Sequence, residues 1–241
     1  MKLGVAISGC GIGAVTAYRI PALLAGIGLA PETFSCCSTS VLPMGLMGLG
    51  IPEQELTSEM EAWAEGLSTR RYKHLRRNLS LRSYNAKETP RILLCAADAI
   101  MAQPVVFDTS GKDMQPEFLS CGPSRFKEIL PGMMGLTYGF KPQRWHGKLL
   151  CDFSVYFGNP FFSLKQCSAE RILLIRFENS QCEPALVSVD RMARQKEPLA
   201  DAVIRVPDLP YRKKGYIEAA EQVLQEAFYK QRQETLEKLI F

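Results

Sequence analysis

A glycine-rich loop and a serine follow the first two apolar segments of the chain, and both could take part in acyl transfer. Leu3 to Ser8 is a short apolar run that ends in the glycine-rich segment 9–13, and a helix-compatible stretch follows from Ala14 to Ala25. Backbone N–H groups of a loop that opens a helix can face a phosphate or a developing oxyanion. The next strand candidate, Thr33 to Cys37, is followed directly by Ser38 and a small-residue apolar segment. Ser38 therefore has the position of a nucleophile elbow, a tight strand-to-helix turn that presents a hydroxyl group.

The same loop formally fits a dinucleotide-binding fingerprint. Gly9, Gly11 and Ala14 have the spacing that lets a pyrophosphate approach a helix N-terminus. That fold also places an acidic residue about twenty residues on, at the end of the second strand. Here the second strand ends in residues 36–38, Cys-Cys-Ser, and Glu32 lies before it. No Lys-Ser/Thr pair closes the loop either, so the pattern favours an oxyanion hole over a nucleotide site.

Strand and helix candidates alternate along the chain, which predicts an α/β protein with a mainly parallel central sheet flanked by helices. Arg171 to Phe177 is almost wholly apolar, a pattern typical of strands that are covered on both faces. Further strands are expected at 91–97, 105–107, 148–151 and 202–206, with helices at 52–67 and 216–239 and a short one within 118–130. No repeat, low-complexity tract or linker divides the sequence, so residues 1–241 are expected to form a single domain.

Composition excludes several classes of protein. The 241 residues are 46% hydrophobic and 22% charged, which is typical of a globular chain and not of a disordered or collagen-like one. The net charge of +4 is too small to indicate a nucleic-acid partner without a concentrated patch. The most apolar window, 41–51, is about half the length of a bilayer span, and the run 3–8 is too short for a signal peptide. We expect no transmembrane segment and a cytoplasmic location.

The cysteines and histidines do not predict a metal centre. The chain has eight cysteines, of which Cys36 and Cys37 are adjacent and several others lie in apolar runs. They are expected to be buried thiols of a reducing compartment. There is no Cys-x-x-Cys pair, and the two histidines, His74 and His146, do not complete a zinc site.

Together these motifs resemble the patatin-like phospholipase family, in its small bacterial single-domain form. The segment 8–14 lies where that family has S-G-G-G-x-R-G, and counting on without a gap places Ser38 on the family's nucleophilic serine and Gly50 on the glycine that closes the next helix. The segment 152–154, Asp-Phe-Ser, occupies the place of D-G-G, and the segment 159–160 lies close to the trailing N-x-P. With further similarity around 90–111, 131–161 and 200–211, the resemblance extends over nearly the whole chain.

The resemblance implies a three-layer patatin-like fold and a serine acyl hydrolase that works without metal or cofactor. In this interpretation Ser38 attacks a lipid or other carboxylic ester, and Asp152 is the general base. N–H groups around Gly9, Cys10 and Gly11 would form the oxyanion hole. The two side chains of the dyad should then lie near hydrogen-bonding distance, with the Phe153 ring turned away from the oxyanion position.

Several glycines of the resembled motifs are replaced in this chain. The replacements are Cys10 in the loop, Cys36 and Ser40 beside the elbow, and Phe153 and Ser154 after the aspartate, while Gly13 stands where the family has Arg or Lys. Replacing a glycine that has positive φ costs about 1–2 kcal/mol. The replacements keep open an alternative function: a catalytically impaired patatin-like protein that binds an acyl lipid or a partner protein.

Three other candidates have simpler interpretations. Cys37 adjoins Ser38, but alternation along the strand directs its side chain elsewhere, so a structural thiol is favoured. His146 could complete a Ser-His-Asp triad, yet a turn residue is the better interpretation. The basic stretch Arg70 to Arg77 could face an anionic membrane surface, although a solvated helix face is favoured. The oligomeric state is not predicted by any of these patterns.

Overall fold

The core of the fold is a mixed sheet with parallel strands at its centre. It contains strands from the N-terminal part of the chain and from the C-terminal part. The structure, a computed structural model, describes residues 1–8, 11–68, 90–111, 116–134, 141–178, 184–210 and 215–240. Within these residues the strands are β1 (Leu3–Ser8), β2 (Thr33–Cys37), β3 (Arg91–Asp98), β4 (Gln103–Asp108), β5 (Leu119–Ser120), β6 (Gln143–Trp145), β7 (Lys148–Asp152), β8 (Arg171–Phe177) and β9 (Ala202–Val206). The main order is β5-β4-β3-β2-β1-β8-β9, and β7 pairs with β3 and with β6.

β8, whose apolar run predicted a strand covered on both faces, lies between β1 and β9 and is almost wholly buried. β1, β2, β3, β8 and β9 are mutually parallel where they pair, whereas β4 and β7 run antiparallel to β3. Every residue of β1 and β2 is buried. Strands covered on both faces are mostly apolar, as β1 is. In β2 the buried hydroxyl of Ser35 is hydrogen-bonded to that of Ser163 at 2.6 Å. The predicted α/β class with a mainly parallel central sheet is therefore confirmed.

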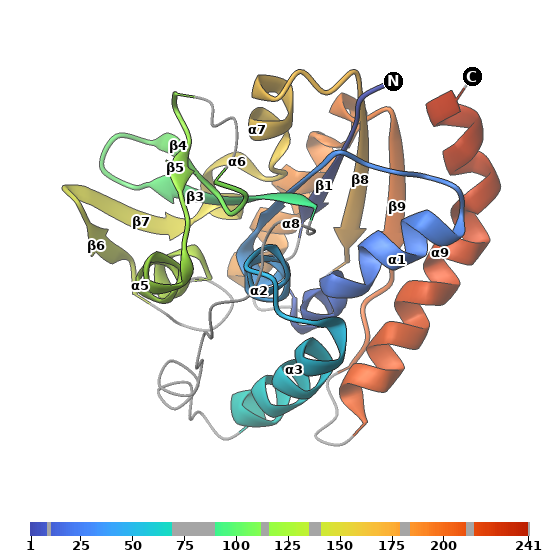
Figure 1. Cartoon of the computed structure of the whole chain (residues 1–241), viewed down its shortest axis with the longest axis horizontal. Coiled ribbons are helices and arrows are strands. Elements are labelled where there is room, and N and C mark those ends of the chain that lie inside the picture. The colour runs from blue at the N-terminus through green and yellow to red at the C-terminus, as the bar shows by residue number, and fades with distance from the viewer. Residues whose placement is uncertain are drawn as a thin grey trace.

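Helices cover both faces of the sheet. They are η1 (Ile12–Arg19), α1 (Ile20–Gly26), η2 (Ser38–Ser40), α2 (Val41–Gly48), α3 (Glu53–Ser68), α5 (Pro123–Met133), α6 (Phe153–Phe157), α7 (Phe161–Gln166), α8 (Pro184–Gln195), η4 (Glu197–Leu199) and α9 (Tyr216–Ile240). The larger layer, η1 with α2, α3, α5 and α9, shares its core with Cys36 of β2. The smaller layer, α6 and α7, packs on the opposite face, beside Cys37. Figure 1 shows α9 alongside β9 at one edge of the molecule.

The first predicted helix, 14–25, differs from the structure in type. Residues 12–19 form a 3₁₀ helix, and the α-helical part begins only at Ile20. Pro21 lies in the first turn of α1 and lacks the N–H that an α-helix continuing from Ala17 would use. The helical segment therefore changes its hydrogen-bonding pattern just before the proline.

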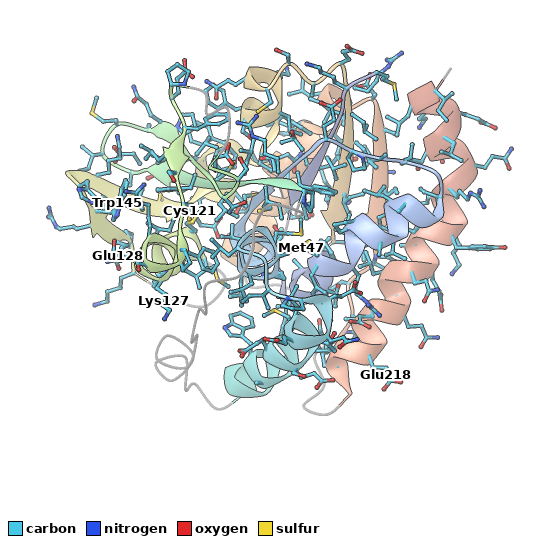
Figure 2. The ribbon with its side chains drawn as sticks, viewed as in Figure 1. Met47, Cys121, Lys127, Glu128, Trp145 and Glu218 are labelled. Carbon is cyan, nitrogen blue, oxygen red and sulfur yellow. The ribbon has the colours of Figure 1, made fainter. Side chains whose placement is uncertain are left out.

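Helix α2 is buried almost all round, and two glycines let it pack closely. A Cβ atom at Gly45 would overlap the Phe126 ring of α5, and one at Gly48 would overlap Thr109. Met47 is the partly buried residue of this helix, and Figure 2 shows it near the centre of the molecule. Because α2 directly follows the Ser38 turn, its packing fixes the turn from the C-terminal side.

The β6–β7 hairpin extends the sheet beside α5. The Trp145 ring of β6 meets the Phe107 ring edge-on, with centroids 5.2 Å apart, and the Arg125 guanidinium lies 5.7 Å from the Trp145 centroid. Figure 2 places Trp145 next to α5, whose Lys127 and Glu128 are directed outward. These contacts anchor the hairpin that carries Asp152 at the end of β7.

Candidate functional site

Ser38 occupies a strained turn between β2 and α2. It has φ of +58°, a left-handed conformation that residues with a Cβ adopt infrequently, while Cys37 before it is extended. Such strain costs about 1–3 kcal/mol and persists only where the surrounding structure holds it. Ser40 supplies one restraint, because its hydroxyl donates to the Cys37 carbonyl at 2.8 Å. The elbow predicted from the sequence is thus present in the backbone.

Two strands that end against β3 bring Ser38 and Asp152 together. Cys37, at the end of β2, pairs with Cys95 of β3, and Asp152, at the end of β7, pairs with the adjacent Ala96. β2 is parallel to β3 and β7 is antiparallel to it, so the carboxyl ends of β2 and β7 meet. The residue after β2 and the last residue of β7 are therefore neighbours, although 114 positions separate them in the sequence.

The two predicted dyad side chains are hydrogen-bonded and buried. Ser38 Oγ donates to Asp152 Oδ2 at 2.7 Å. The exposed fraction is 0% for Ser38 and 2% for Asp152. A carboxylate at this distance from a hydroxyl group can accept its proton, which is the arrangement that general-base activation of a serine requires.

The other carboxylate oxygen of Asp152 is held by Ser154. Asp152 is the N-cap of α6, and its Oδ1 accepts the Ser154 N–H at 3.0 Å and the Ser154 hydroxyl at 2.6 Å. Asp152 thus caps a short helix with one oxygen and meets Ser38 with the other. Ser154 was not predicted from the sequence as a site residue. An Asp followed two residues later by Ser at the end of a strand is a helix-capping pattern that could have indicated it.

Phe153 packs away from α2. Its ring belongs to a buried cluster with Cys37, Leu93 and Cys95 on the α6 face of the sheet, and it lies 4.9 Å from the Phe157 ring. α2, which follows Ser38, is on the opposite face. The Phe153 side chain is therefore accommodated in the smaller helical layer.

The predicted oxyanion loop is described only in part. Gly11 is the extended N-cap residue of η1, with φ −144° and ψ 164°, and its carbonyl accepts the Ala14 N–H at 3.1 Å. Gly9 and Cys10 lie outside the described residues. Ser8, the last residue of β1, is buried and carries the chain into this loop.

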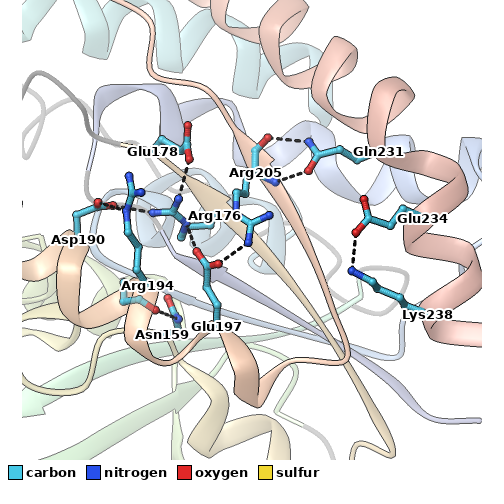
Figure 3. A network of polar contacts seen from close by, with 11 residues as sticks. Asn159, Arg176, Glu178, Asp190, Arg194, Glu197, Arg205, Gln231, Glu234 and Lys238 are labelled. Carbon is cyan, nitrogen blue, oxygen red and sulfur yellow. Dashed lines mark hydrogen bonds and ion pairs between the residues drawn. The ribbon is translucent and has the colours of Figure 1, made fainter.

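A buried arginine lies beside the start of this loop. Arg176 of β8 pairs in register with Ser8 and is 1% exposed. Its guanidinium contacts three carboxylates: Asp190 at 2.9 Å, Glu178 at 2.7 Å and Glu197 at 2.5 Å (Figure 3). The charge buried behind the loop is thus compensated on several sides, as a desolvated ion requires.

This ionic network extends to the surface on two sides. Arg194 pairs with Asp190 at 2.8 Å, and Arg205 pairs with Glu197 at 2.6 Å. The Arg205 backbone in turn exchanges hydrogen bonds with Gln231 of α9, as Figure 3 shows. The network therefore connects α8, η4, β9 and α9 to the end of β8.

The remaining candidates lie elsewhere. His146 is exposed in the β6–β7 turn, with φ of +44°. The five-residue strand from Lys148 to Asp152 adds about 13 Å between His146 and the dyad. The Cys37 thiol contacts the carbonyls of Ile7 and Gly158 and is fully buried. The stretch 70–77 falls outside the described residues.

The cysteines that the structure describes are thiols outside disulfide bonds, and most of them are buried. They are Cys36, Cys37, Cys95, Cys121, Cys151 and Cys167. Burial raises the pKa of Cys95 to about 11, that of Cys121 to about 12 and that of Cys151 to about 11. Across the part of the chain that the structure describes, no cluster of three or more His, Cys, Asp or Glu side chains could hold a metal ion. None of the described helices is both long and apolar enough to cross a membrane.

Comparison with known proteins adds no family to this geometry. No protein-family model matches the chain, and no curated protein matches it significantly. The assignment of a function therefore depends on the fold and on the contacts of the site.

Proposed function

We propose that the protein is a serine acyl hydrolase of the patatin-like type, which cleaves lipid or other carboxylic esters through Ser38 and Asp152. The hydrogen bond of 2.7 Å between Ser38 Oγ and Asp152 Oδ2 carries the proposal. It is supported by the left-handed backbone of Ser38 between a strand and a helix, the backbone geometry of a nucleophile elbow. A serine that only caps a helix does not need this conformation, because N-cap residues are typically extended.

Ser38 and Asp152 can supply the nucleophile and the general base for acyl transfer, with Asp152 taking up and returning one proton in each half of the reaction. As Ser38 Oγ bonds to the ester carbonyl carbon, its proton passes to Asp152 Oδ2. The tetrahedral intermediate then collapses, the bond to the leaving alkoxide breaks, and that oxygen takes the proton from Asp152. Water attacks the acyl carbon next, gives its proton to Asp152, and Ser38 leaves with that proton. Gly9, Cys10 and Gly11 are the proposed donors to the oxyanion, each commonly worth about 3 kcal/mol in such sites.

The substrate is proposed to be an uncharged ester carbonyl carried on an acyl chain. The dyad is enclosed by apolar elements, since α2 is buried almost throughout and the Phe153 cluster lies on the other side of the sheet. Ser38 has no exposed surface, so an ester reaches Oγ only after neighbouring atoms have moved. Small esters should therefore be hydrolysed faster than long-chain esters.

The proposed site employs protein groups alone. Hydrolysis should therefore continue at the same rate after EDTA is added.

Hydrolysis of p-nitrophenyl acetate, butyrate and octanoate by the purified protein tests the proposal. Ser38→Ala should abolish turnover. Ser163→Ala is the matched control, because it removes a buried hydroxyl that is bonded to Ser35 at 2.6 Å and not to the dyad. Equal rates of hydrolysis for the wild type and Ser38→Ala would refute the proposed hydrolase function.

One observation favours the alternative, a patatin-like protein that binds an acyl lipid or a partner without turnover. The hydroxyl of Ser38 and the carboxylate of Asp152 are closed off from solvent. In that case no ester is cleaved, and a fluorophosphonate probe does not label Ser38. Ser38-dependent labelling of the native protein would exclude the alternative.

A further inference from the structure

Asp152 has two different partners on its two oxygens, and this division points to a role for Ser154. Oδ2 receives the Ser38 hydroxyl, and Oδ1 receives both the hydroxyl and the N–H of Ser154. Resting on the proposed hydrolase function, we infer that Ser154 is the positioning residue of the dyad: its hydroxyl fixes the orientation of the Asp152 carboxylate so that Oδ2 faces Ser38.

The geometry separates the hydroxyl's role from that of the backbone. The Ser154 N–H at 3.0 Å is the ordinary helix-capping bond that any residue at this position could donate to Asp152. The hydroxyl at 2.6 Å is an additional donor that only a hydroxyl side chain supplies. Two donors that converge on Oδ1 resist rotation of the carboxylate about its Cβ–Cγ bond, and one donor does not define the plane as well. Hydrogen bonds to a charged acceptor are also the strong ones, particularly where solvent is excluded.

Ser154 is itself held firmly. It is 1% exposed, and its carbonyl accepts the Gly158 N–H at 3.1 Å. The other end of α6 is tied to the residue that follows α8, because Lys196 Nζ donates to the Phe157 carbonyl at 2.7 Å. Asn159 just beyond donates to the Ala193 carbonyl of α8 at 2.9 Å. Because α6 is fixed at both ends, the Ser154 hydroxyl is held in a constant position relative to Asp152.

The test compares Ser154→Ala, Ser154→Thr and the control Ser163→Ala with the wild type. Ser154→Ala removes the hydroxyl and keeps the N–H, so kcat should fall about 10- to 100-fold, the size expected for one hydrogen bond to a charged group, while KM stays unchanged. Ser154→Thr keeps the hydroxyl and should recover most of the loss. Ser163→Ala, which loses a buried hydroxyl elsewhere, should retain kcat. A merely structural role for Ser154 would lower the melting temperature of Ser154→Ala and Ser163→Ala alike and leave kcat per folded molecule unchanged.

Crystal structures of the wild type and of Ser154→Ala provide a readout that does not depend on turnover. The Asp152 carboxylate should rotate in the variant, and the contact from Ser38 Oγ to Oδ2 should lengthen. If the wild type is inactive and the carboxylate still rotates, the proposed function fails and the positioning role stands. If the wild type is active but Ser154→Ala keeps both its kcat and the Ser38–Asp152 contact, the positioning role is overturned and the hydrolase stands.

Discussion

Two serine hydroxyls lie against the Ser38–Asp152 pair at positions where the resembled family carries glycine. Ser40 donates to the Cys37 carbonyl beside the elbow, and Ser154 donates to Asp152. Both side chains are buried without disrupting the turn. At these two positions a hydroxyl side chain adds a restraint on the site.

Removing the charge of the base should stop catalysis with little effect on the fold. Asp152→Asn keeps the shape of the side chain but cannot accept the Ser38 proton, so kcat should fall by about 10²- to 10⁴-fold. Asp98→Asn is the matched control, because Asp98 is equally buried on β3 and accepts the Ile100 and Leu149 N–H groups. Rates with p-nitrophenyl butyrate and melting temperatures are measured for both variants. A similar loss of rate in both would argue against a specific role for Asp152.

The thiols of Cys95 and Cys121 should not react with alkylating reagents in the native protein. Burial raises the pKa of Cys95 to about 11 and that of Cys121 to about 12. At about pH 8 a thiol with an ordinary pKa near 8.5 is partly ionised, but these two remain protonated, and the thiolate is the reactive form. Iodoacetamide at this pH should leave both unmodified and should alkylate both in guanidinium chloride, as mass spectrometry of each cysteine peptide would report. Rapid native alkylation of Cys95 would contradict the burial on which this expectation depends.

At the scale of elements, apolar runs predicted the sheet, and the pairing around the site was harder to predict. The strands 3–8, 33–37, 171–177 and 202–206 have the bounds expected from sequence. Strands 3–8 and 171–177 have the largely apolar character of buried strands. The antiparallel β7, which delivers Asp152, was not expected to meet β2 end to end, since that depends on long-range register along β3. The short α6 was not predicted, because five residues are too few to show a helical periodicity. Ser38 and Asp152 were identified only through the resemblance and the turn pattern, and Ser154 needed the structure.

The packing of α2 makes the elbow sensitive to added volume. Gly45→Ala would place a methyl group into the Phe126 ring, and overpacking of this kind commonly costs about 1–3 kcal/mol. Gly26→Ala is the control, since it is also a helical glycine and a Cβ there meets nothing within 4 Å. Urea unfolding followed by circular dichroism should show a lower free energy of unfolding for Gly45→Ala alone. Equal stability of the two variants would mean that α2 can shift away from α5 at no cost.

At the scale of the whole molecule, the Arg176 network connects the site's surroundings to the C-terminal helix. Arg176 lies opposite Ser8, where β1 enters the glycine loop, and contacts Asp190 of α8. Through Glu197 and Arg205 the same network continues to Gln231 of α9. Residues that follow the dyad in the chain are tied to α8 as well, by Lys196 and Asn159. The ion pairs around Arg176 and these hydrogen bonds therefore connect α6 and α8 with β9 and α9.

Breaking this network at its centre should destabilise the fold far more than breaking a surface ion pair on the same strand. Arg176→Met leaves three carboxylates near one another without their shared cation, and removal of one partner of a buried ion pair typically costs about 3–5 kcal/mol. Arg171→Met is the matched control: it removes the same charge from the other end of β8, where the side chain is 42% exposed and pairs with Asp201, so its cost should be about 1 kcal/mol or less. Urea titrations of the two variants measure the difference, and hydrogen exchange should show faster exchange in α8 and α6 for Arg176→Met only. If both variants lost the same small amount of stability, the Arg176 network would not be what holds α8 and α6 in place.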